Sequence, residues 1–279
     1  GTIILVGAGD PTLSRTAPGV QSVYKDAPKL SNLAVQVNAW AKGTPITRII
    51  LDSTKFAGPS WESSWERSEQ TESYMPEITA LTTDGDRAKP GNQDSPRSTK
   101  PVTRAGAAFK AAIGSLASTA TVEQGSLPAG AVQIAKVNSQ PISKWITHMM
   151  QVSDNTEAEY LARLVAIKNG LSASFGSIDL AIKKSLLPTK LDTTGVVIKD
   201  GSGLSDYNRV APSVLAKFMK LVVTDYADFD VIKQGLPIAH ESGSLSSRFG
   251  GENIDAAGHI FAKTGWIKNG YTLAGYITA

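Results

Sequence analysis

Two short motifs contain the side chains of this sequence that are best suited to chemistry. Ser153-Asp154-Asn155 offers a hydroxyl, a carboxylate and an amide, and Lys263-Thr264-Gly265 offers an amino group and a second hydroxyl. The glycine has a use at a strand end, because it lets a substrate or another backbone come close. Each triplet alone is a weak signal, since such combinations recur by chance. Together in one chain, the two triplets are a stronger signal than either one alone.

The first motif lies where two helices are expected to meet. Apolar residues recur at helical spacing from Pro141 to Val152, and a second helical pattern continues to about Lys168. The inward face of this second helix is expected to carry Ala158, Leu161, Leu164 and Val165. Ser, Asp and Asn are also preferred at helix N-termini, so Ser153-Asp154-Asn155 has a structural explanation as well. The two explanations are compatible, because a serine at a helix start still presents its hydroxyl.

The second motif lies on the first strand of an expected hairpin. The run 259–266 predicts a strand, and Tyr271 to Thr278 predicts its partner, with Asn269-Gly270 as the turn between them. A lysine at a strand end is often simply solvated. Lys263 becomes a candidate functional residue only because Ser153-Asp154-Asn155 is also present.

Periodicity and turn residues predict the remaining elements. Strands are expected at 2–6, 46–51, 131–137 and 194–198, and helices at 30–41, 105–117, 175–187, 212–223, 229–234 and 244–249. The stretch 52–106 shows no periodicity and is expected to be loop-rich, with Trp61 and Trp65 as core anchors. A small α/β region followed by a helical block and an antiparallel strand pair indicates an α+β protein.

Composition and spacing exclude several classes of function. The chain has no cysteine, which excludes thiol catalysis and disulfides. A net charge of +3 gives no reason to expect a nucleic-acid partner, and no apolar run has the length of a membrane span.

The three histidines, His148, His240 and His259, lack metal-ligand spacing, so we expect no metal and no cofactor. We expect His148 and His259 to be core or surface histidines. Gly7-Ala8-Gly9 lacks the last glycine of a dinucleotide site.

A larger set of motifs occurs in a specific order. These are Gly9-Asp10-Pro11-Thr12-Leu13-Ser14, Ser153-Asp154-Asn155, Asp200-Gly201-Ser202-Gly203-Leu204-Ser205, Ser242-Gly243-Ser244-Leu245 and Lys263-Thr264-Gly265. With them the chain resembles, over nearly its whole length, the class C low-molecular-mass penicillin-binding proteins. These are D-alanyl-D-alanine carboxypeptidase/endopeptidases of the penicillin-binding protein 4 type. Serine enzymes that recognise penicillin combine S-D-N and K-T-G with an S-x-x-K nucleophile motif.

The resemblance implies an α+β fold like that of serine β-lactamases and penicillin-binding transpeptidases, a sheet flanked by helices with an inserted, loop-rich α/β accessory region. On that map, residues 1–140 are inserted accessory material. Residues 141–279 form the C-terminal part of the penicillin-binding, transpeptidase-like domain.

The resemblance also implies a reaction. The family hydrolyses the terminal D-Ala-D-Ala bond of peptidoglycan stem peptides by acylation of a serine, followed by attack of water. Stem peptides and β-lactam antibiotics are therefore the implied partners. An extracytoplasmic location, and an export signal ahead of Gly1, are implied as well.

Each motif residue takes a role from the resemblance. Ser153 would relay protons to the leaving amine, and Asn155 would hold the substrate's amide. Lys263 would supply positive potential beside Ser153 and attract the terminal carboxylate, to which Thr264 would hydrogen-bond. The backbone N–H of Trp266 would be one of two oxyanion donors. Many relatives carry Thr or Ser at this position, and Trp266 removes that hydroxyl.

The nucleophile is the part of the pattern without a convincing match. One S-x-x-K occurs, at Ser22-Val23-Tyr24-Lys25, but Pro18 and Pro28 flank it and a long helix cannot start there. The family's nucleophile segment is expected before Gly1, and the 279-residue chain by itself is expected to do no covalent chemistry. A serine β-lactamase and a non-catalytic cell-wall-binding module remain the alternatives.

Overall fold

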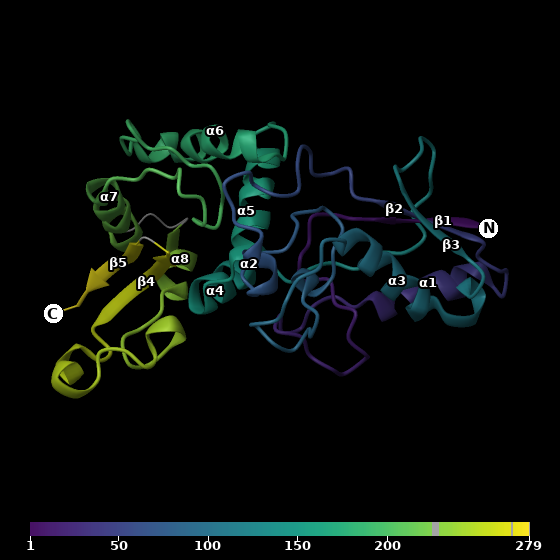
Figure 1. Ribbon diagram of the computed structural model, residues 1–279, viewed down its shortest axis with the longest axis horizontal. Coiled ribbons are helices and arrows are strands. Elements are labelled where there is room, and N and C mark those ends of the chain that lie inside the picture. Colours follow the sequence, from purple (N-terminus) through teal and green to yellow (C-terminus); the bar gives the residue numbers. More distant parts are fainter. Residues whose placement is uncertain (225–228, 269, 279) are drawn as a thin grey trace. The chain divides into compact units, whose positions relative to one another are not determined.

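The computed structural model describes residues 1–224, 229–268 and 270–278, and the chain divides into two compact units (Figure 1). The first unit comprises Gly1–Gln140 with Ser172–Ser174, and the second comprises Pro141–Leu171 with Phe175–Ala279. The interpretation of the first unit as an inserted accessory region stays a prediction.

The first unit is built on a parallel sheet of three strands in the order β1 (Thr2–Val6), β2 (Arg48–Asp52) and β3 (Thr121–Gly125). Helices α1 (Leu30–Ala41) and α3 (Pro101–Ile113) connect these strands and contact each other (Figure 1). Alternate strand residues pack against the helices to form the core, with Ile3, Leu5, Ile49 and Leu51 joined by Leu33, Val37 and Phe109. A side chain on Gly106 of α3 would collide with Leu51, which shows how closely the helix approaches the sheet.

The stretch between β2 and α3 is loop-rich, as predicted. It contains only α2 (Ser68–Thr71) and the 3-10 turn η1 (Asp84–Asp86), while η2 (Gly114–Ala117) follows α3. Trp61 and Trp65 are buried and pack edge to face, with ring centroids 5.2 Å apart, which confirms them as core anchors.

The second unit is mainly helical and ends in a β-hairpin. In chain order it contains α4 (Ile142–Val152), α5 (Asn155–Lys168), α6 (Phe175–Leu186), η3 (Leu187–Thr189), α7 (Pro212–Val223), α8 (Asp230–Gly235), η5 (Gly243–Leu245), η6 (Gly251–Ala256), β4 (Ile260–Ile267) and β5 (Gly270–Ile277). The two strands pair antiparallel, as predicted, and the predicted turn residue Asn269 lies outside the described residues.

One face of the hairpin packs on the helices. Phe261 and Tyr276 stack at a centroid distance of 4.9 Å and join the apolar cluster of Met150, Met219, Val222 and Leu236. Lys263 lies on the same face of β4 as Phe261, because side chains alternate along a strand. The helical packing of this face therefore determines where the amino group of Lys263 can reach.

Two predicted strands are wrong. Residues 131–137 form no strand, although Ile134 and Val137 are half-buried and pack on the core. The backbone N–H and carbonyl of Lys136 hydrogen-bond to the Gln36 side chain instead of to a neighbouring strand. The third strand is β3, which follows α3 after one 3-10 turn. Residues 194–198 form no strand either, since Val197 makes only an isolated bridge to Arg209. The helix predicted at 244–249 is reduced to η5.

The predicted inward face of α5 is also wrong. The four apolar residues predicted to face inward are only half-buried, and the buried side chains of α5 include Glu157, Glu159 and Arg163. The reason is the partner that packs there: the backbone N–H groups of Gly201 and Ser202 both donate to Glu159 Oε1, at 2.8 Å each. A turn whose N–H groups lack backbone acceptors requires another acceptor, so α5 buries the carboxyl group of Glu159 there.

Candidate active site

Ser153 occupies a strained joint between two helices. Helix α4 ends at Val152, and Ser153 adopts the left-handed conformation, with φ 58° and ψ 49°. Asp154 then caps α5, because its Oδ1 accepts a hydrogen bond from the Glu157 N–H at 3.1 Å. A residue with a Cβ is uncommon in the left-handed region, and such residues concentrate at functional sites. The joint leaves the hydroxyl-bearing Ser153 exposed while Asp154 is buried.

Lys263 meets Ser153 across the second unit. Its Nζ donates to Ser153 Oγ at 2.7 Å and to the Thr264 carbonyl oxygen at 2.6 Å. Burial lowers the pKa of the Lys263 amino group from 10.5 to about 8, so the group is still mainly protonated at neutral pH. The pair can therefore place a positive charge beside a hydroxyl and pass a proton between them.

Thr264, the residue after Lys263, contacts Ser244, to which the sequence analysis assigned no role. Its Oγ1 lies 2.9 Å from Ser244 Oγ, and either hydroxyl can be the donor. Ser244 belongs to η5, and the preceding segment runs beside β4, since the Ala262 N–H donates to the Pro237 carbonyl at 3.0 Å. The only sequence signal for Ser244 was its place in the Ser242-Gly243-Ser244-Leu245 motif.

The remaining predicted residues, Asn155, Gly265 and Trp266, belong to the same two elements, α5 and β4. Asn155 is the first residue of α5 and is half-buried. Trp266 is exposed and lies opposite Tyr271 in the hairpin. A side chain on Gly265 would collide with the Thr272 hydroxyl of β5, so packing within the hairpin already requires a glycine there.

Comparison with known proteins identifies the family. The model of the D-Ala-D-Ala carboxypeptidase 3 (S13) family matches residues 1–95 and 88–279. The chain belongs to this family. It is 34% identical over 282 residues to the carboxypeptidase Rv3627c of Mycobacterium tuberculosis and, to the same extent, to the carboxypeptidase DacB of Mycolicibacterium smegmatis. Both matches cover 100% of this chain and 60% of the relative, so the chain spans less than two thirds of their length.

Solved structures resemble the chain in fold. The crystal structure of penicillin binding protein 4 (dacB) from Haemophilus influenzae matches with a TM-score of 0.81 and 20% sequence identity, over 100% of this chain and 73% of that one. A second structure of that protein, complexed with a novel β-lactam, matches with a TM-score of 0.76 at 19% identity. The predicted α+β, penicillin-binding fold is thereby confirmed.

The local S-x-x-K sequence of this S13 family chain does not form the expected nucleophile geometry. Ser22 is buried in the first unit, where its hydroxyl donates to the Tyr24 carbonyl at 3.1 Å and accepts from the Tyr24 N–H at 3.2 Å. No helix covers residues 22–25, so one helical turn does not bring Lys25 beside Ser22. The structure gives no support to Ser22 as a nucleophile.

A cluster of acidic and histidine side chains is formed by residues on either side of Ser153 in the chain. His148, Asp154 and Glu157 each place a potential ligand atom within 4.8 Å of the others. His148 Nδ1 already lies 2.6 Å from Glu157 Oε2, and Asp154 Oδ1 already accepts from the Glu157 N–H. The His148 and Glu157 side chains thus contact each other, and the Asp154 carboxylate caps α5, so these groups connect the residues on either side of Ser153.

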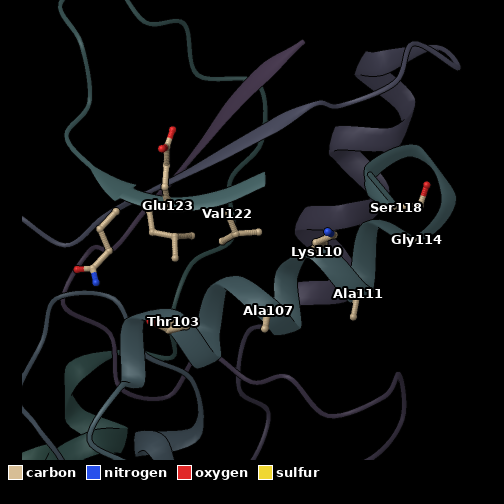
Figure 2. A pocket seen from close by; sticks show the side chains of 10 residues that line it. Thr103, Ala107, Lys110, Ala111, Gly114, Ser118, Val122 and Glu123 are labelled. Carbon is tan, nitrogen blue, oxygen red and sulfur yellow. The ribbon is translucent and has the colours of Figure 1, made fainter. Parts of the chain in front are cut away.

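A groove of about 500 Å³ lies elsewhere, in the first unit. Figure 2 shows one wall formed by the small α3 side chains Thr103, Ala107 and Ala111, with Glu123 of β3 pointing away from the helix. None of the residues of the two motifs lines this groove.

Proposed function

We propose that this chain supplies the proton-relay and substrate-binding half of a serine D,D-carboxypeptidase that removes the terminal D-Ala from peptidoglycan stem peptides. The observation that carries the proposal is the 2.7 Å hydrogen bond from Lys263 to Ser153, between the two motifs that the family resemblance singled out. The nucleophile is a serine of an S-x-x-K segment that precedes Gly1 in the full-length protein. β-Lactams acylate the same serine.

In the acylation step, the nucleophilic serine attacks the carbonyl carbon of the penultimate D-Ala, and its hydroxyl proton passes to the lysine of its own S-x-x-K segment. The bond to the terminal D-Ala nitrogen breaks, and that nitrogen takes the proton of the Ser153 hydroxyl. Negative charge that develops on Ser153 Oγ is stabilised by the N–H of Lys263, which already points at this atom. The S-x-x-K lysine returns the proton that it took to Ser153 Oγ. Water then adds to the acyl carbon, the ester bond breaks to release the shortened peptide as a carboxylic acid, and a proton from the water restores the nucleophilic serine.

Lys263, Thr264 and Ser244 together recognise the C-terminal end of the substrate. The carboxylate of the terminal D-Ala binds beside Lys263 and accepts a hydrogen bond from the Thr264 hydroxyl, which Ser244 orients. Asn155 holds the peptide amide, and the Trp266 N–H contributes to the oxyanion hole. Peptides that lack a free carboxylate at this end should therefore be poor substrates.

The names of the relatives support the reaction class, and they include D-alanyl-D-alanine carboxypeptidase DacB of Haemophilus influenzae, which is 33% identical over 146 residues. The proposed substrate lies outside the cytoplasmic membrane, so an extracytoplasmic location belongs to the same proposal. None of the described helices is long and apolar enough to cross a membrane.

The test uses the full-length protein with two peptides that differ only in their last residue, D-Ala or L-Ala. We expect release of D-Ala from the first peptide alone, and a covalent adduct with a labelled penicillin. Ser22→Ala should leave both signals unchanged. Binding of stem peptides without D-Ala release would favour a non-catalytic wall-binding module, and fast turnover of penicillin without D-Ala release would favour a β-lactamase.

A further inference from the structure

We infer that His148 and Glu157 are positioning residues for Ser153: their contact fixes the joint between α4 and α5 and thereby holds the Ser153 hydroxyl against Lys263. The contact between the two side chains is a geometric feature of the structure. Its consequence for the reaction rests on the proposed function of Ser153.

On its N-terminal side, the joint is stabilised by hydrogen bonds to the Met149 carbonyl group. Both the Ser153 N–H and the Asp154 N–H donate to the Met149 carbonyl oxygen, the latter at 3.2 Å. On the C-terminal side, Asp154 Oδ1 accepts from the Glu157 N–H at 3.1 Å. Backbone and cap contacts thus close the turn at each end, but these contacts alone do not fix the angle between the two helices.

The Glu157 side chain adds a direct side-chain contact between the two helices. It reaches from α5 back to α4, where its Oε2 lies 2.6 Å from His148 Nδ1. The two residues stand on opposite sides of Ser153 in the chain, so a change in their separation changes the angle between α4 and α5. Because Lys263 belongs to a different element, β4, such a change also alters the distance from Lys263 Nζ to Ser153 Oγ.

Burial makes this contact a rigid one. The Glu157 side chain is 1% exposed and the His148 side chain 25%. Exposed ion pairs are mobile and weak, whereas a buried carboxylate that loses a hydrogen-bond donor is strongly disfavoured and forces its surroundings to adjust. The pair is therefore suited to hold the left-handed Ser153, whose conformation is strained on its own.

The experiment compares four variants of the full-length protein. His148→Ala removes the donor, His148→Asn keeps a nitrogen near the position of Nδ1, and Glu157→Gln keeps the shape of the acceptor but removes its charge. Lys144→Ala, an exposed change on the same helix, is the matched control. The first readout is the NMR signal of the Lys263 side chain in protein carrying isotope-labelled lysine, assigned with Lys263→Arg. The second is the separation of kcat from KM for the D-Ala-D-Ala peptide.

We expect His148→Ala and Glu157→Gln to shift the Lys263 signal, His148→Asn to restore it in part, and Lys144→Ala to leave it unchanged. A displacement of about 1 Å can cost on the order of 100-fold in rate, so kcat should fall by roughly tenfold or more while KM changes little. An unchanged Lys263 signal in both folded His148→Ala and Glu157→Gln would overturn the inference, whatever happens to thermal stability. If His148→Ala fails to fold, the near-isosteric Glu157→Gln decides. An inactive wild-type protein would refute the proposed function, and the NMR comparison would still decide the positioning role.

Discussion

The amino group of Lys263 donates a 2.7 Å hydrogen bond to the hydroxyl of Ser153, although the two residues are 110 positions apart in the sequence. One lies at a left-handed joint between helices and the other on a strand, so two independent parts of the unit must be built correctly for the bond to form. Burial lowers the pKa of Lys263, and the contact gives this lysine a defined target for its proton. This relationship underlies the predictions for Lys263 and Ser153.

Replacing Lys263 should slow acylation while leaving the fold intact. A hydrogen bond involving a charged group contributes about 1.5–3 kcal/mol, so Lys263→Ala should lower the rate of acylation by a penicillin roughly 10- to 150-fold. Stopped-flow measurement of acylation provides the test. Lys268→Ala, an exposed lysine that follows β4, removes the same charge and should leave the rate nearly unchanged. Equal effects of the two changes would show that only the general charge of the hairpin matters.

The pH dependence of activity should report the lowered pKa of Lys263. The amino group loses its proton as pH rises through about 8, instead of near 10.5, so substrate capture through the terminal carboxylate should weaken above pH 8. Stability should move the other way: because the folded pKa is the lower one, the folded state binds fewer protons than the unfolded state between about pH 8 and 10.5. The free energy of unfolding of the wild type should therefore rise with pH relative to Lys263→Ala across that range. A basic limb of kcat/KM close to the ordinary lysine pKa of 10.5 would contradict the assignment.

Much of the fold was predictable because strong amphipathic patterns determine helices locally. The helices at Leu30–Ala41 and Pro212–Val223 have the predicted bounds. The third strand was missed because Thr121-Val122-Glu123-Gln124-Gly125 has no apolar alternation, and as an edge strand it is mostly exposed. The apolar residues near Ile134 suggested a strand, but they pack on the core without pairing. Periodicity detects burial, and it does not distinguish a paired strand from a packed extended segment.

The sequence singled out candidate site residues by type, but it did not specify how their side chains are arranged. Motif chemistry proposed Ser153, Asn155, Lys263 and Thr264 as candidates, and the contact of Thr264 with Ser244 was not predicted. His148 was predicted to be a core or surface histidine, and the structure pairs it with Glu157 across the Ser153 joint. That pairing depends on the angle between two helices, which no local pattern specifies.

Ser153 should show opposite effects on stability and function. Its left-handed conformation costs about 1–2 kcal/mol for a residue with a Cβ and little for glycine. Ser153→Gly should therefore be more stable than Ser153→Ala by about 1 kcal/mol, while both lose the proton relay to the leaving amine. Urea unfolding measures the first effect and D-Ala release the second. An alanine variant as stable as the glycine variant would mean that the joint relaxes out of the left-handed region.

Glu159 should make the stability of the second unit depend on pH in the opposite sense to Lys263. Its burial, with the charge of nearby Asp200, raises the pKa of the carboxyl from 4.5 to about 8. Because the folded pKa is the higher one, the folded state holds a proton that the unfolded state releases between pH 4.5 and about 8. The stabilisation from this proton is fully present below pH 4.5 and is lost as pH rises through about 8.

Glu159→Gln isolates this contribution. The amide keeps an oxygen that can accept from the Gly201 and Ser202 N–H groups, but it cannot ionise. Between about pH 5 and pH 8 we expect the wild type to lose stability relative to Glu159→Gln in urea unfolding. The exposed change Glu252→Gln should follow the wild type at both pH values. A constant difference between wild type and Glu159→Gln would mean that Glu159 stays ionised in the folded protein, with the nearby Arg163 guanidinium as the group that compensates its charge.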